Sequence, residues 1–174
     1  MSDIFIDGGG GDRIYLERYL NKLPTFDKVY VFEPNPFFHD SYNESNLILI
    51  KKAIWTKNCT LDFYLSKDEW QVGSSLLKEK LCRDEDLKLC ASPNWQDAPI
   101  KVKCVDFSEW IAANIKSHHN LTLKLDIEGA EYEVLWKMIN DGTISLVNKL
   151  YVEFHKSHLK VKDEDHKKLI KKLE

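Results

Sequence analysis

Four consecutive glycines, Gly8 to Gly11, directly follow an acidic residue, Asp7. The segment before them, Ile4–Ile6, is apolar and predicts a buried strand that ends in a turn. Glycines at such a point let a ligand lie against backbone amides at the start of a helix. Dinucleotides and S-adenosylmethionine are the two ligand classes that use this arrangement, and we expect one of them here. The alternative is a plain glycine-rich turn in which Asp12 caps the helix.

The dinucleotide fingerprint, Gly-x-Gly-x-x-Gly, fails in both possible frames. A frame that starts at Gly8 needs glycine in place of Arg13, and one that starts at Gly9 needs glycine in place of Ile14. The carboxylate of Asp7 instead suits the ammonium group of S-adenosylmethionine, whereas it would repel a pyrophosphate. We expect the methionine part of this donor to be bound by Asp7, Gly8, Gly9 and Gly10.

A second acid, Glu33, ends the next apolar run, Val29–Phe32. A carboxylate at the end of a second parallel strand can accept hydrogen bonds from both hydroxyl groups of a ribose. Pro34 fixes the turn that follows and should hold this carboxylate near the edge of the sheet. We therefore expect Glu33 and Pro34 in the donor site; the alternative is an exposed acid in a turn.

A third group of acids follows the apolar run Leu121–Leu125. Glu128 and Glu131 fall at the mouth of a helix, where negative charge favours the helix dipole. Asp126 differs from them because it ends the strand itself, beside the proposed donor crevice. We expect Asp126 both to contact the donor and to take part in catalysis.

Glu153 and His155 flank Phe154 after the last apolar run, and strand geometry directs both to the same face. His155 is a candidate general base for a hydroxyl proton, although a lone histidine is more often structural. An equally open alternative is a divalent cation bound by Asp126, Glu153 and His155, which form an oxygen-rich set with one imidazole.

The elements that must position these residues alternate between strands and helices. This order predicts a parallel α/β sheet with right-handed crossovers, and the lack of repeats or linkers predicts a single domain over residues 1–174. The patterns predict strands at 4–6, 29–32, 47–55, 60–65, 100–105, 121–125 and 150–154, and helices at 16–23, 37–43, 76–90, 106–116, from 126–130 to Gly142, and 162–173.

Composition narrows the setting of the protein. A chain of 174 residues with 43% hydrophobic residues can bury a core of its own. A net charge of −3 is too weak to favour nucleic acid or an anionic membrane as partner. No apolar run approaches the roughly 20 residues that a membrane span requires. The N-terminus lacks a secretory pattern and the cysteines lack paired spacing, so we expect a reducing, cytoplasmic location.

Three motifs together resemble the FkbM family: Phe5–Gly9, Val31–Pro36 and Lys124–Leu135. The likeness spans roughly residues 4–155, and Val152–His155 is similar to the next strand of that family. FkbM proteins are class I methyltransferases that use S-adenosylmethionine and mostly methylate hydroxyl groups on sugars, glycolipids and polyketides. The resemblance implies a three-layer, Rossmann-like fold with a mostly parallel sheet.

The resemblance also implies roles for single residues. By it, Asp7 and Gly9 belong to the methionine-binding loop and Glu33 to the ribose site. Ala53, with Ile54 after it, lies at a strand end beside adenine. Ser75 belongs to a serine-bearing loop near the donor.

The chain departs from the family in two places. The family loop usually reads Asp-x-Gly-Ala-Asn-x-Gly, whereas this chain has glycines and then Asp12. The class I sheet normally ends in a hairpin of two further strands, whereas this sequence stops at Glu174 after a lysine-rich helix. Either the chain is truncated at its C-terminus or the sheet lacks that hairpin.

These observations predict an O-methyltransferase that transfers a methyl group from S-adenosylmethionine to a hydroxyl of a sugar or glycan. Trp70 and Trp95 are available to stack on sugar rings or, equally, to cap the core. The alternatives are a polyketide or other small-molecule hydroxyl as acceptor, methylation of an amine or a protein, and an inactive donor-binding interaction domain.

Overall fold

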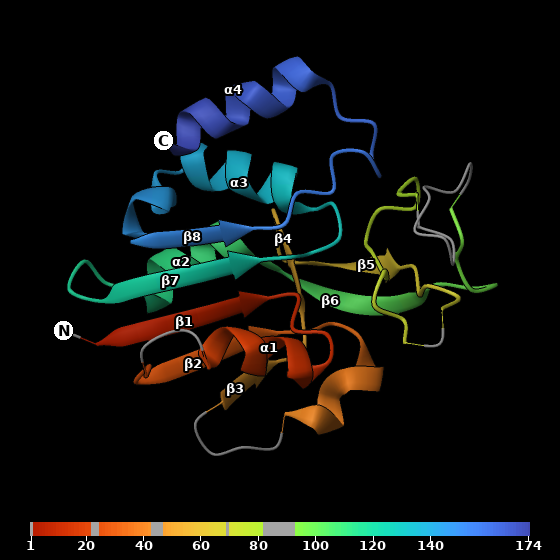
Figure 1. The fold of residues 1–174 in the computed structure, drawn as a ribbon, viewed down its shortest axis with the longest axis horizontal. Helices are drawn as coiled ribbons and strands as arrows, with labels where there is room; N and C mark the ends of the chain where they lie inside the picture. The colour runs from red at the N-terminus through yellow and green to blue at the C-terminus, as the bar shows by residue number, and fades with distance from the viewer. Residues whose placement is uncertain (1, 22–24, 43–46, 69, 82–92) are drawn as a thin grey trace.

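The computed structural model describes residues 2–21, 25–42, 47–68, 70–81 and 93–174. Within these ranges a central sheet has five strands, and each neighbouring pair is parallel (Figure 1). Its order is β3 (Leu47–Ile50), β2 (Lys28–Phe32), β1 (Asp3–Gly8), β7 (Asn120–Leu125) and β8 (Lys149–Val152).

A second, smaller sheet packs beside the carboxyl ends of the central strands (Figure 1). In it β6 (Ile100–Asp106) pairs in parallel with β4 (Ala53–Trp55) and antiparallel with β5 (Cys59–Phe63). The described helices are α1 (Arg13–Leu20), α2 (Phe107–Asn114), α3 (Glu131–Asn140) and α4 (Asp163–Leu173), with 3-10 turns η1 (Pro36–Ser41) and η2 (Thr143–Leu146).

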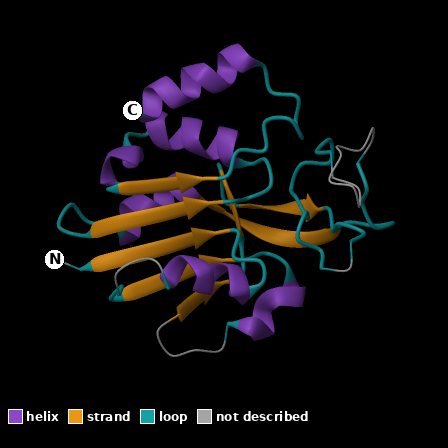
Figure 2. Cartoon of the chain, in the orientation of Figure 1, coloured by secondary structure: helices purple, strands orange, loops and turns teal. Residues whose placement is uncertain are grey.

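Helices cover both faces of the central sheet, which gives the three layers that the sequence predicts (Figure 2). Alternation along β1 produces these two faces. Ile4 and Ile6 pack into the larger core with α2, α3 and α4, whereas Phe5 packs into a second core with α1 and η1. The α/β fold class with a mostly parallel, Rossmann-like sheet is therefore confirmed.

Local signals placed two helix ends correctly. The side chain of Asp106 accepts a hydrogen bond from the backbone N–H of Glu109 at 3.1 Å and caps α2 at the residue where the predicted helix 106–116 begins. Gly142 lies just beyond α3 with a φ of 78°, a conformation that favours glycine over other residues.

The prediction of one strand over residues 47–55 is wrong. The backbone N–H of Lys52 donates to the carbonyl of Ile50 at 2.8 Å, and this tight turn redirects the chain. Residues before it therefore form β3 in the central sheet, and Ala53 begins β4 in the smaller one.

Two predicted helices also differ from the structure. The helix expected to open at 126–130 begins only at Glu131, because Glu128 and Gly129 have φ values of 55° and 109°, outside the helical range. The helix expected over 76–90 is absent from residues 76–81, which form turns, and its remainder, 82–90, lies outside the described residues.

None of the helices in the described ranges combines the length and the apolar character that a bilayer crossing requires.

Candidate active site

A cavity of about 300 Å³ lies at the carboxyl ends of β1, β2 and β7. Parallel strands end at the same edge of a sheet, and open α/β sheets bind their ligands there. The smaller sheet and the segment 71–76 form the opposite side. The walls consist of Gly9, Gly10, Gly11, Phe32, Glu33, Pro34, Asn35, Phe38, Ala53, Ile54, Phe63, Gln71, Val72, Ser74, Leu76, Lys124, Asp126, Ile127, Glu128 and Glu153.

The glycine loop allows three strand ends to approach closely. The N–H groups of Gly9 and Gly10 donate to the carbonyl of Phe32 at 3.1 and 3.2 Å, so these two amides join β1 to β2. A side chain at Gly9 would put its Cβ 1.8 Å from the carbonyl oxygen of Asp126. Gly9 and Gly10 thus line the cavity, whereas Gly8 lies outside its lining and bonds to β7 through the amide of Asp126 at 2.9 Å.

Asp7 is fully buried next to the cavity and is not part of its lining. The Nζ atom of Lys124 lies 2.9 Å from its Oδ1 atom and 3.3 Å from the carbonyl oxygen of Gly9. Burial raises the pKa of Asp7, and the ammonium of Lys124 opposes that shift. In this structure Asp7 binds a lysine beneath the loop, so a ligand ammonium in the cavity would not meet its carboxylate directly.

Glu33 lies at the end of β2 in the cavity wall, where the sequence places it. Its two carboxyl oxygens accept hydrogen bonds from the backbone N–H groups of Gly11 at 2.7 Å and Asn35 at 2.6 Å. Burial outweighs these bonds and raises its pKa to about 7. A carboxylate has about four lone-pair positions, so both oxygens can still accept a bond from a ligand. Pro34 lines the cavity beside it.

The apolar part of the wall comes mainly from the smaller sheet. Ala53 and Ile54 of β4 and Phe63 of β5 line it. Ala53 begins β4 and does not end a strand, so its place beside adenine stays a prediction. Ser75 lies behind the wall, where its hydroxyl donates to the carbonyl of Glu128 at 2.7 Å. Its neighbour Ser74 lines the cavity instead.

Asp126 and Glu128 both line the cavity, and their surroundings shift their acidities in opposite directions. Burial, together with the nearby acids, raises the pKa of Asp126 to about 7, although Lys124 opposes the shift. Burial also acts to raise the pKa of Glu128, but hydrogen bonds and charge from His155 and Lys80 outweigh it and hold that pKa below its ordinary value. Asp126 can therefore exchange a proton near neutral pH, whereas Glu128 stays ionised.

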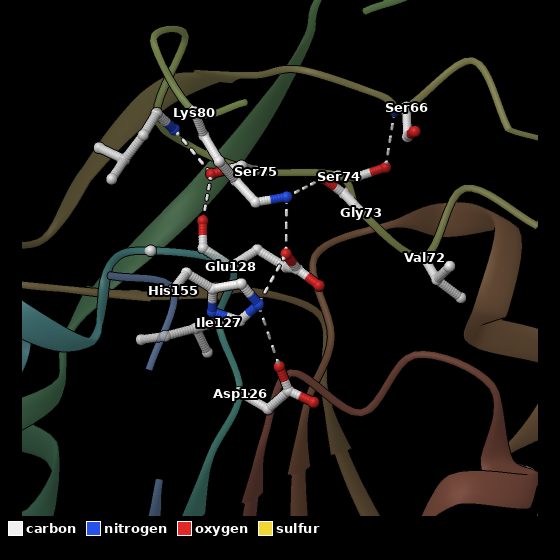
Figure 3. Close-up of polar contacts among 12 residues, drawn as sticks. Ser66, Val72, Gly73, Ser74, Ser75, Lys80, Asp126, Ile127, Glu128 and His155 are labelled. Atoms are coloured by element: carbon white, nitrogen blue, oxygen red, sulfur yellow. Dashed lines mark hydrogen bonds and ion pairs between the residues drawn. The ribbon is translucent and has the colours of Figure 1, made fainter. Parts of the chain in front are cut away.

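His155 is buried outside the cavity lining, and each of its ring nitrogens lies next to a carboxylate. Figure 3 shows its contact with Glu128. Its Nε2 atom is 3.1 Å from Glu128 and its Nδ1 atom is 3.1 Å from Glu131. Burial lowers the pKa of the imidazole, but these two carboxylates raise it to about 10. A protonated ring has no lone pair to accept a further proton, and this geometry does not favour the general-base role that the sequence suggested.

Three side chains in the described ranges could together hold a metal ion. Ligand atoms of Asp126, Glu131 and His155 all lie within 4.8 Å of one another. Glu153, expected as a ligand, is exposed at the cavity rim and is not part of this group. Because metal ligation needs a neutral imidazole, a cation would have to displace the proton that two carboxylates stabilise on His155.

Sequence reasoning missed two lysines of this site. Lys124 could have been found, since a single lysine within the apolar run Leu121–Leu125 needs a buried partner. Lys80 lies in a stretch without periodicity, where no pattern distinguishes it from exposed lysines such as Lys78. Gln71, which lines the cavity, carries no signal either, whereas Val72 belongs to the segment 72–76 that resembles a serine-bearing loop near the donor.

Comparison of the chain with known proteins gives one match, to a family model. The model of the methyltransferase FkbM domain matches residues 14–174. The match begins after the glycine run and continues through α4, beyond the motifs described above. Neither the search of curated proteins nor that of solved structures gave a match. Because the family model covers nearly the whole chain and the fold agrees with it, the chain belongs to the FkbM methyltransferase family.

Proposed function

We propose that the protein is an S-adenosylmethionine-dependent O-methyltransferase that acts on a hydroxyl group of a sugar or glycan. The observation that carries the proposal is one cavity lined by two carboxylates of different acidity, Asp126 and Glu128, together with Glu33 at the end of the second strand. A carboxylate that can bind ribose hydroxyls suits a methyl donor that contains a nucleoside. An acid–base pair in the same cavity suits a methyl acceptor that has to lose a proton.

The donor would lie across the ends of β1, β2 and β4. Glu33 would accept hydrogen bonds from the ribose hydroxyls, and Ala53, Ile54 and Phe63 would contact the adenine ring. Gly9 and Gly10, which line the cavity, would contact the methionine part. Asp7 would act indirectly, by holding Lys124 and the loop in place.

When bound, S-adenosylmethionine supplies the methyl group, and its sulfur keeps the electron pair of the broken carbon–sulfur bond. The protein has to align the acceptor oxygen with that carbon and remove the hydroxyl proton. Asp126 would take this proton, because its pKa of about 7 allows it to accept a proton and release it to water. Glu128, which stays ionised, would orient the hydroxyl as a hydrogen-bond acceptor.

A neutral polyol acceptor suits the electrostatics and the rim of the cavity. Asp126, Glu128 and Glu153 put negative charge on this side, which disfavours an anionic acceptor. Trp70 is 61% exposed and directly precedes two cavity-lining residues, so its ring is available to a sugar. Trp95 is not equally available, because its indole N–H donates to the carbonyl of Lys78 at 2.7 Å.

The proposal needs no divalent cation. Lys80 lies 2.7 Å from Glu128, and His155 lies between Glu128 and Glu131, so these two acids already have basic partners. We also keep the expectation of a cytoplasmic location, which fractionation of cells that express the tagged chain would test.

Calorimetry with S-adenosylmethionine and its product, S-adenosylhomocysteine, tests the donor. We expect saturable binding, and no binding at millimolar donor would contradict the proposal. Methyl transfer to a panel of neutral glycans, with and without chelator, tests the acceptor and the cation. Turnover should survive chelation, and Asp126→Asn should keep product binding but lose turnover. Donor binding with no transfer to any hydroxyl acceptor would instead favour an inactive binding domain.

A further inference from the structure

Lys80 is a buried lysine outside the cavity lining, with 3% of its side chain exposed. Its Nζ atom donates to the carbonyl of Gly73 at 2.9 Å and lies 2.7 Å from Oε2 of Glu128 (Figure 3). The ring of Trp95 lies 5.8 Å from the same atom. Burying an ammonium group costs free energy unless its partners compensate for the lost water. Lys80 therefore depends on these contacts to stay buried.

The partner of Lys80 on the strand side is held in an unusual conformation. Glu128 has a left-handed φ of 55°, which is rare for a residue other than glycine. Ser75 binds its carbonyl at 2.7 Å, and His155 approaches the same Oε2 atom as Lys80, at 3.1 Å. Strained residues that several contacts hold in place are typical of functional sites. The carboxylate of Glu128 is therefore fixed in direction where it lines the cavity.

The other partner of Lys80 belongs to the opposite wall. Gly73 lies within the segment 71–76, of which Gln71, Val72, Ser74 and Leu76 line the cavity. Leu77, the residue directly after this segment, packs near the strand-end loop, because a Cβ atom at Gly129 would lie 3.2 Å from its Cδ1 atom. One ammonium thus connects two cavity walls that lie far apart in the sequence (Figure 3).

We propose that Lys80 is a positioning residue for methyl transfer: by joining Gly73 to Glu128 it sets the separation of the two walls between which donor and acceptor meet. This inference rests on the proposed function. It predicts that Lys80 acts through Glu128 and not as an independent stabilising contact.

Binding of S-adenosylhomocysteine to Lys80→Met, Glu128→Gln and the double variant tests this coupling. Loss of a charged hydrogen bond should weaken binding about tenfold in each single variant. The double variant should be no weaker than the worse single variant, because both changes break the same link. Effects that multiply, or a Lys80→Met variant that binds as the wild type does, would overturn the proposal. Lys78→Met, which changes an exposed lysine of the same segment, is the matched control.

Lys80→Arg covers the case in which the methionine variant does not fold. The guanidinium keeps the charge and the pairing with Glu128, so affinity should stay within about threefold of the wild type. A folded arginine variant that binds more than tenfold worse would contradict a role carried by the ion pair.

Amide hydrogen exchange of residues 70–76 separates this proposal from the donor assignment. Exchange there should be faster in Lys80→Met than in Lys78→Met, with or without ligand. If the wild type does not bind S-adenosylhomocysteine, the proposed function fails. The exchange rates of the unliganded variants still test the link between the walls in that case. Equal exchange in the two variants would overturn the link itself.

Discussion

The carboxyl group of Glu33 has little water around it, and this burial controls its acidity. Two backbone amides stabilise its charged form, yet burial still raises its pKa to about 7 from an ordinary 4.5. The folded state therefore holds a proton that the unfolded state releases between these two values. The contribution of this shift to folding stability is therefore fully present below pH 4.5 and is lost as the pH rises towards 7.

Glu33→Gln should remove this pH dependence. Between pH 4.5 and 7 the unfolding free energy of the wild type should fall, relative to the glutamine variant, by up to about 1.4 kcal/mol per pH unit. Denaturant melts at several pH values measure this difference. Other titrating groups, such as Asp126, are present in both proteins and largely cancel. Parallel curves for the two proteins would show that folding does not raise the pKa of Glu33.

The roles of single residues could be predicted from sequence only where position along a strand determines them. Glu33 and Asp126 end apolar runs of parallel strands, so their meeting in one cavity followed from topology. The raised pKa of His155 did not, because it depends on contacts with Glu128 and Glu131, and no sequence pattern indicates the left-handed φ of Glu128.

Among the elements, the glycine loop differs from position to position in whether it can accept a side chain. Gly9 has a φ of 81°, and a Cβ atom there would overlap the backbone of Asp126. Gly11 has a φ of 52° but no atom within 4 Å of such a Cβ. A side chain at Gly9 would therefore meet both a steric clash and backbone strain, whereas one at Gly11 would meet strain alone. Such strain costs about 1–2 kcal/mol.

Gly9→Ala should therefore push apart the ends of β1 and β7 and abolish binding of S-adenosylhomocysteine. Gly11→Ala should lower stability by only about 1–2 kcal/mol and retain binding. Calorimetry and thermal melts of both variants provide the measurement. Equal losses of binding in the two variants would mean that strain, and not the approach of the strands, limits the loop.

Strands with a clear alternation or an apolar run were predictable as elements, since burial on one or both faces leaves that pattern in β1, β2 and β7. The break between β3 and β4 was not, because the apolar residues continue on both sides of Lys51 and Lys52. Only pairing partners far away in sequence, such as Cys104 beside Ala53, assign the second half to another sheet.

At the scale of the whole molecule, the cavity lies between two sheets that are built from different strands. Its walls come from the central sheet through Glu33 and Asp126 and from the smaller one through Ala53 and Phe63. A ligand that binds both walls should stabilise both sheets together, because it binds only when they are assembled. The prediction of a single domain over residues 1–174 leads to the same expectation.

S-adenosylhomocysteine should therefore shift one cooperative unfolding transition as a unit. At a ligand concentration of about 100 times Kd the gain is about 2.7 kcal/mol, which corresponds to a rise in Tm of roughly 5–10 °C for a chain of this size. Calorimetric scans of the wild type and of Gly9→Ala measure it, and the variant should show no shift. A second transition that the ligand leaves unmoved would mean that the sheets unfold separately, and that the cavity is an interface between two units instead of the centre of one.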